Sequence, residues 1–105
     1  MRILALERAV EGVSDADCAP LLRAEAHRAW ELYQLGVLRE LYFRPDTHEA
    51  VLLLECGDTQ EALSVLSSLP LVAHHLIDFT IIPLTPYTGF ERLFAEDPGS
   101  GGDSH

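Results

Sequence analysis

Apolar and polar residues follow two different periods along this chain. Four stretches alternate or run apolar in the manner of β-strands, and two longer stretches repeat apolar residues at helical spacing. The strand-like stretches are residues 2–8, 37–44, 50–56 and 76–84, and the helical ones are about residues 16–35 and a segment from Thr59 to Pro70. Residues 86–95 are expected to form a closing turn and a short helix that docks Phe90, Leu93 and Phe94.

Both predicted helices are bounded by residues that commonly begin and end helices. Ser14 or Asp15 can cap the first, and Gly36 can adopt the left-handed conformation that ends it. Thr59 can cap the second, and Pro70 ends it. The first helix carries an apolar stripe that consists of Cys18, Leu22, Ala26, Ala29 and Tyr33, with Trp30 and Leu32 on its flanks.

The order of strand, helix, strand, strand, helix, strand is that of the ferredoxin-like α+β class. This βαββαβ arrangement has a four-stranded antiparallel sheet with two helices on one face, and its first and third strands are central. Here both central strands are apolar on both faces: Ile3 and Ala5 lie opposite Leu4 and Leu6, and Leu52 and Leu54 lie opposite Val51 and Leu53. Since two helices cover only one face, we expect a second copy of the chain to cover the other, as a homodimer joined sheet to sheet.

The outer strands are consistent with this dimer. The side chains expected to face the helices are Val37, Leu41, Phe43, Ile77, Phe79 and Ile81, and those expected on the other face are Glu40, Tyr42, Arg44, Asp78 and Thr80. The polar residues would rim the interface. Tyr42, Arg44 and Asp78 then form either a polar site inside it or an ion pair that fixes the register of the two chains.

Composition narrows the classes of function. The chain has 17 acidic residues against seven basic ones, all arginine, and a net charge of −10, which opposes nucleic acids and anionic membrane surfaces. No apolar run is long enough to span a membrane. Cys18 and Cys56 lack metal-site spacing and are expected to be buried free thiols, which fits a cytoplasmic protein. We expect one domain over residues 1–95, followed by a flexible tail over residues 96–105.

Several segments, in this order, resemble the muconolactone isomerase family of dimeric α+β barrel proteins. They are residues 34–42, the hairpin, residues 59–63, and Leu69-Pro70-Leu71 ahead of Ile77-Asp78-Phe79, and the match extends from Met1 to about Pro86. The resemblance implies a homodimer or a larger ring of dimers, no cofactor, and proton transfer within a small unsaturated lactone or related organic acid. The family enzyme has lysine and acidic residues on its first helix, where this chain has Arg23 and Glu25.

Glu25 is the first candidate for catalysis, because it lies at the edge of the apolar stripe where partial burial raises a carboxyl pKa. The alternative is an ordinary carboxylate that is solvated or forms an ion pair, with Arg23 and Arg28 as the natural partners. His74 or His75 could shuttle a proton at the mouth of the pocket. As adjacent residues in an extended segment they point to opposite sides and cannot easily chelate one metal ion, so no metal site is expected.

Candidate ligand contacts come from Arg23 and from the aromatic residues. Trp30 and Tyr33 can wall a pocket for a flat organic ligand, or they can be core aromatics. Tyr42 is a further candidate contact, and Tyr87 is expected to close one end of the pocket within residues 86–90. Three functions stay open: a cofactor-independent isomerase, a noncatalytic small-ligand-binding or stabilising protein, and a cofactor-free oxygenase.

Overall fold

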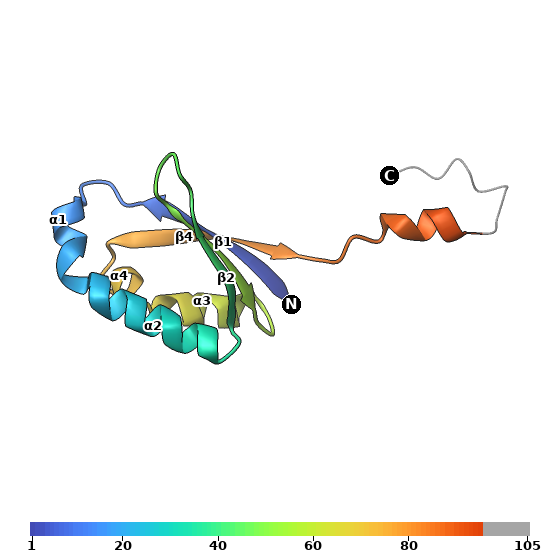
Figure 1. Ribbon diagram of the computed structural model, residues 1–105, viewed down its shortest axis with the longest axis horizontal. Helices are drawn as coiled ribbons and strands as arrows, with labels where there is room; N and C mark the ends of the chain where they lie inside the picture. Colours follow the sequence, from blue (N-terminus) through green and yellow to red (C-terminus); the bar gives the residue numbers. More distant parts are fainter. Residues whose placement is uncertain (96–105) are drawn as a thin grey trace.

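The structure is a computed structural model that describes residues 1–95; residues 96–105, for which the sequence predicts a flexible tail, lie outside the described part. The predicted order of strands and helices is confirmed (Figure 1). The elements are β1 Arg2–Ala9, α1 Asp15–Cys18, the 3-10 helix η1 Ala19–Leu21, α2 Leu22–Gln34, β2 Leu38–Phe43, β3 Ala50–Glu55, α3 Thr59–Ser67, α4 Pro70–Ala73, β4 Ile77–Leu84 and the 3-10 helix η2 Gly89–Phe94.

The four strands form one antiparallel sheet in the order β2-β3-β1-β4, so β1 and β3 are central as predicted. Leu4 of β1 lies opposite Leu53 on one side and Ile82 on the other. Pro83 lies on the edge strand β4, where the missing N–H costs no bond to a further strand. Helices α2, α3 and α4 all lie on one face of the sheet (Figure 1).

The first helical segment is broken, because Pro20 has no N–H to donate within a continuous helix. The chain therefore passes through α1 and η1 before α2 begins at Leu22. At the start of the segment, the Ser14 N–H donates to the Asp17 carboxylate at 2.8 Å. After its end, Gly36 adopts the predicted left-handed conformation, with φ +79°. In the second helix the cap is Asp58 rather than Thr59, since Asp58 Oδ1 accepts the Glu61 N–H at 2.8 Å.

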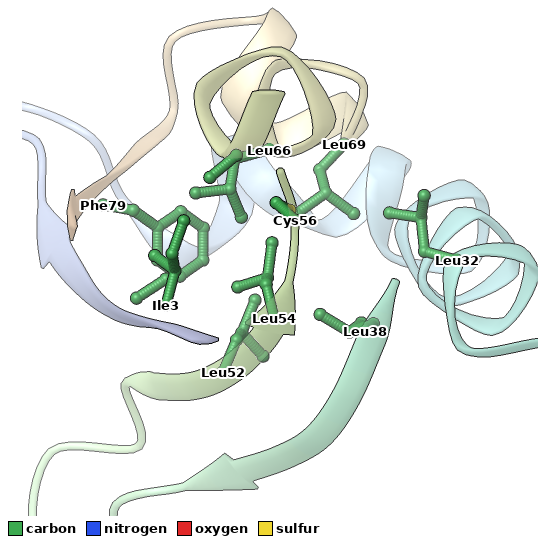
Figure 2. Close-up of a cluster of buried hydrophobic side chains, with 11 residues drawn as sticks. Ile3, Leu32, Leu38, Leu52, Leu54, Cys56, Leu66, Leu69 and Phe79 are labelled. Atoms are coloured by element: carbon green, nitrogen blue, oxygen red, sulfur yellow. The ribbon is translucent and has the colours of Figure 1, made fainter. Parts of the chain in front are cut away.

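The hydrophobic core lies between the sheet and the helices, where Leu66 and Leu69 meet Leu54 of β3 (Figure 2). From α2, Leu32 is buried in this core, whereas the stripe beside it is not. A bulge in β2 between Leu38 and Glu40 sets which residues face the helices. At the start of this strand Leu38 is buried, whereas Val37, which the simple alternation turns toward the helices, is partly buried and packs against the core.

The opposite face of the sheet is apolar and has no helix over it within residues 1–95 (Figure 1). It carries Leu4, Leu6, Val51, Leu53 and Ile82, which are partly exposed. The predicted alternation of the two central strands is therefore confirmed. A sheet that is apolar on both faces needs a second cover.

The segment after β4 does not dock as the sequence predicts. Residues 85–88 form no helix or strand, and η2 stands apart from the sheet and the other helices (Figure 1). Phe90, Leu93 and Phe94 are 65, 74 and 79% exposed. Pro86 favours an extended backbone for the residue before it, so the chain continues outward from the end of β4 instead of turning back.

Candidate functional site

An open cavity of about 1040 Å³ lies between α2 and the helix-facing side of the sheet. Its walls are mainly apolar: Leu22, Ala26 and Ala29 come from α2, and Leu41, Leu52 and Phe79 come from the sheet. The predicted stripe of the first helix therefore lines this cavity. It does so because Leu32, on the flank of the stripe, anchors α2 to the core and leaves the rest of the stripe facing open space.

Glu25 projects from α2 into this cavity and is partly buried. Its Oε1 accepts the backbone N–H of Leu71 at 2.9 Å. Burial raises the pKa of the Glu25 carboxyl; the Leu71 hydrogen bond lowers it, and the charge of Glu7 raises it further. The net direction is upward, which brings the group closer to the pKa of a useful general base at neutral pH.

The expected arginine partners of Glu25 are engaged elsewhere or lie outside the cavity. Arg28 Nη1 pairs with Glu31 at 3.2 Å, and its Nε donates to the Ser68 hydroxyl at 3.0 Å. Arg23 is exposed and does not line the cavity. Within residues 1–95, Glu25 forms no ion pair, so the alternative of an ordinary salt bridge is wrong.

A second carboxylate, Glu7, lines the cavity from β1 and was not predicted as a site residue. Its Oε1 accepts the Ala50 N–H at 2.8 Å, which holds it at the edge of β3. The sequence did contain a signal. Ile3, Ala5 and Glu7 alternate on the helix-facing side of β1, and an acidic residue on a covered face is unusual enough to mark a site.

Trp30 and Tyr33 form an aromatic wall at the cavity. Their rings are stacked with centroids 5.8 Å apart, and they are 57 and 48% exposed. They are therefore not core aromatics, and the interpretation as a pocket wall fits their placement. Such a surface suits a flat ring that stacks against them.

His48 also lines the cavity, from the turn between β2 and β3. This histidine is exposed to solvent in that turn. Its ring stacks on Phe43 with centroids 4.2 Å apart, and its φ of +60° lies in the left-handed region. The hairpin turn thus places the imidazole of His48 at the cavity.

Besides Arg23, three further predicted site residues lie away from the cavity. His74 and His75 are exposed in the turn between α4 and β4, where His75 has φ +61°, and neither lines the cavity. Tyr87 is 72% exposed and packs edge-on against Phe90 in the outward segment. It does not close the pocket, because residues 85–88 lead away from the sheet.

Tyr42, Arg44 and Asp78 are not brought together within one chain. The Tyr42 hydroxyl donates to Glu40, which raises the pKa of the phenol. Arg44 pairs with Asp46 at 2.7 Å in the hairpin, and Asp78 pairs with Arg8 across two strands. Within one chain these three residues form local pairs, so the polar site or interchain ion pair expected inside the dimer interface stays a prediction. Tyr42 also lines the cavity.

Both cysteines are free thiols, but only Cys56 is buried. Cys18 is half-buried at the cavity, and burial, followed by the charges of Asp15 and Asp17, raises the pKa of its thiol. A neutral thiol is a poor nucleophile. In the part of the chain that the structure describes, no three histidine, cysteine or acidic side chains are grouped as a metal ion would need, and no helix is long and apolar enough to cross a membrane.

Comparisons with known proteins agree with the geometry. The sequence profile of the muconolactone delta-isomerase family matches residues 7–89. A crystal structure of muconolactone isomerase at 3.3 Å resolution superposes with a TM-score of 0.67, at 18% sequence identity, over 84% of this chain and 92% of that one. Among curated proteins no sequence matches the chain. The structural likeness shows a shared α+β fold.

Proposed function

The chain belongs to the muconolactone delta-isomerase family, and on that premise we propose that it is a cofactor-independent isomerase in which Glu25 moves a proton within an unsaturated lactone or related carbonyl compound. The family and the fold support an isomerase-like or related function. One observation carries the choice of Glu25. It is a partly buried carboxylate that faces an open, mainly apolar cavity and forms no ion pair with an arginine among residues 1–95.

The proposed step is an intramolecular proton shift. Glu25 takes a proton from the carbon next to a double bond that is conjugated with the ring carbonyl, and the electron pair is delocalised toward the carbonyl oxygen. The Glu25 carboxylic acid formed in this way then returns the proton to the carbon next to the carbonyl, so that the double bond changes position. One C–H bond breaks and one forms, so the substrate and product are isomers. A base with a raised pKa is suited to both halves of the step, since it must accept the proton and then release it.

The cavity also favours a protein that binds a ligand over a purely stabilising one. A stabilising protein that kept the fold and lost both ligand binding and chemistry would be expected to fill the pocket with side chains and to pair Glu25 outward. Here the space beside Glu25 is open, and the carboxylate turns inward to the Leu71 amide. Trp30 and Tyr33 are placed to hold a flat ring near it.

We further propose that the protein works as a homodimer in which the open faces of two sheets meet. The support is the row of apolar residues on that face, among them Leu4, Leu53 and Ile82, which no helix of the described chain covers. A two-fold symmetric pair of such faces is self-complementary. Their burial would remove the apolar surface from water.

The isomerase proposal is tested by proton exchange in heavy water. The wild-type protein is incubated with muconolactone and with its methyl ester, and deuterium uptake at the ring carbons is followed by NMR. We expect exchange with at least one compound, lost in Glu25→Gln and kept in Glu11→Gln, which removes an exposed acid that does not line the cavity. Exchange that survives in Glu25→Gln contradicts the assignment of the base, and no exchange in the wild type contradicts the proposal.

A further inference from the structure

Among residues 1–95, the acidic residues that line the cavity have no arginine or lysine beside them in its walls. Glu7, Asp15 and Glu25 line it from three separate elements or their ends. Among residues 1–95, the one lining side chain able to carry a positive charge is His48, in the exposed hairpin turn. A ligand in this cavity therefore meets a field of negative sign.

The arginines that could offset the negative charge of the cavity lie elsewhere. None lines the cavity, and the chain contains no lysine. Five of them have partners outside the site: Arg2 with Glu55, Arg8 with Asp78, Arg28 with Glu31, Arg39 with the Gly36 carbonyl, and Arg44 with Asp46. The bidentate arginine contact that proteins favour for carboxylates is thus missing from the walls of the site.

The rest of the lining fits an apolar ligand of some size. Leu22, Ala26 and Ala29 face Leu41 and Leu52 across the space. The volume of about 1040 Å³ is slightly above the range of roughly 300–1,000 Å³ that is typical of pockets for drug-sized molecules. A single five-membered lactone would leave much of this space unfilled.

Building on the proposed isomerase function, we infer that the substrate of this cavity is an uncharged, mainly apolar ring compound with a carbonyl group, and not a carboxylate. A carboxylate held beside Glu25 would place two negative charges in a partly desolvated site, with Glu7 adding a third. Repulsion of this kind disfavours binding far more than it would in water, because the effective dielectric constant is lower. A neutral carbonyl compound avoids this repulsion and still offers the acidic C–H bond that the base needs.

Glu7 is the residue that we assign to this selectivity. It is fixed by the Ala50 amide, it lines the same cavity, and its charge already acts on Glu25. Because it is not the proposed base, it can be changed without removing the proton acceptor. Its replacement by glutamine should keep a hydrogen-bond acceptor for Ala50 and remove one negative charge from the wall.

The test measures binding, so it is independent of whether the chain catalyses proton exchange. Two matched pairs are titrated into the full-length protein near neutral pH and moderate salt: muconolactone against its methyl ester, and coumarin-3-carboxylate against its ethyl ester. We expect the ester of each pair to bind about tenfold more tightly or better, since one repulsive contact at low effective dielectric is worth at least that factor. Glu7→Gln should narrow the gap by improving binding of the acids, and Glu11→Gln should leave it unchanged.

Two results overturn the inference. One is an acid that binds as tightly as its ester, or more tightly, in either pair. The other is a lack of measurable binding by both esters at millimolar concentration. Loss of proton exchange with normal ester binding would instead contradict the isomerase proposal alone, so the two failures are distinguishable.

Discussion

Glu25 on α2 accepts the backbone N–H of Leu71 at 2.9 Å and so joins the helix that carries it to the start of α4. Pro70, at the first position of α4, has no N–H, and the next amide is one of those that a helix start leaves without an internal partner. The Leu69-Pro70-Leu71 segment thus supplies a donor that holds the carboxylate at the cavity. The segment that carries the resemblance to the family therefore also orients Glu25, the proposed base.

Replacing Glu25 should separate stability from activity. Glu25→Gln keeps an oxygen for the Leu71 N–H and removes a carboxylate that is partly desolvated, so we expect thermal stability equal to or above that of the wild type at neutral pH and no proton exchange. Glu25→Ala leaves the amide without a partner and should lower the free energy of unfolding by about 1–3 kcal/mol. Differential scanning calorimetry and deuterium uptake check both.

The sign of the pH effect on stability follows from the raised pKa of Glu25. The folded protein holds this proton more tightly than the unfolded chain does, so the contribution of the group to stability is present at low pH and is lost as pH rises through the folded pKa. The stability difference between Glu25→Gln and wild type should therefore grow with pH. A difference that shrinks as pH rises would contradict the burial of an ionised carboxylate here.

The fold could be predicted because local pattern and long-range packing agree. Alternation in β1 and β3 and the stripe on α2 are properties of single segments, and the ferredoxin-like order follows from them. The prediction was wrong where a local irregularity interrupts the regular spacing of apolar residues. Pro20 breaks the first helix, and a bulge in β2 turns Leu38 toward the core.

The site was harder to predict because it depends on where segments lie relative to one another. Tyr33 is on the helix stripe and Glu25 and Trp30 lie at its edges, so the sequence could place them. Glu7 required the alternation of β1 to be followed to its polar end, and His48 required knowledge that the hairpin turn lies over the cavity. The apolar residues after β4 suggested docking, whereas Pro86 favours an extended backbone that leads the chain outward, which is why Tyr87 was misplaced.

Replacing Glu7 should move the pH profile of the reaction. Three causes act on Glu25: burial, the Leu71 N–H from α4, and the charge of Glu7 from β1. The acidic limb of the pH profile of kcat/KM reports the pKa of the base in the free enzyme. In the wild type this pKa should be higher than that of an ordinary carboxyl group. In Glu7→Gln one raising cause is gone, so the limb should move to lower pH. A limb that stays in place in this variant would show that another group governs it.

Trp30 should report ligand binding, because it is the one tryptophan of the chain and it lines the cavity. We expect its emission to change on titration with an uncharged lactone. Trp30→Ala should raise KM by roughly fivefold with a smaller change in kcat, since loss of an aromatic contact costs about 1 kcal/mol. Trp30→Phe keeps a flat ring and should recover most of the affinity. An equal loss in kcat and kcat/KM would assign Trp30 to the transition state instead.

The homodimer should depend on the uncovered face of the sheet. Leu53 lies on that face opposite Leu4 and Glu40, and Leu53→Glu would place like charges in the centre of the proposed interface. We expect the wild type to run as a dimer or larger ring in size-exclusion chromatography with light scattering at micromolar concentration, and Leu53→Glu to run as a monomer. Leu63→Glu, at a leucine of α3 that is 49% exposed, is the matched control and should leave the assembly unchanged. Circular dichroism separates dissociation from unfolding, because a folded monomer keeps the helix and strand signal. A wild-type monomer at that concentration, or a Leu53→Glu protein that remains dimeric, would require a different cover for this face.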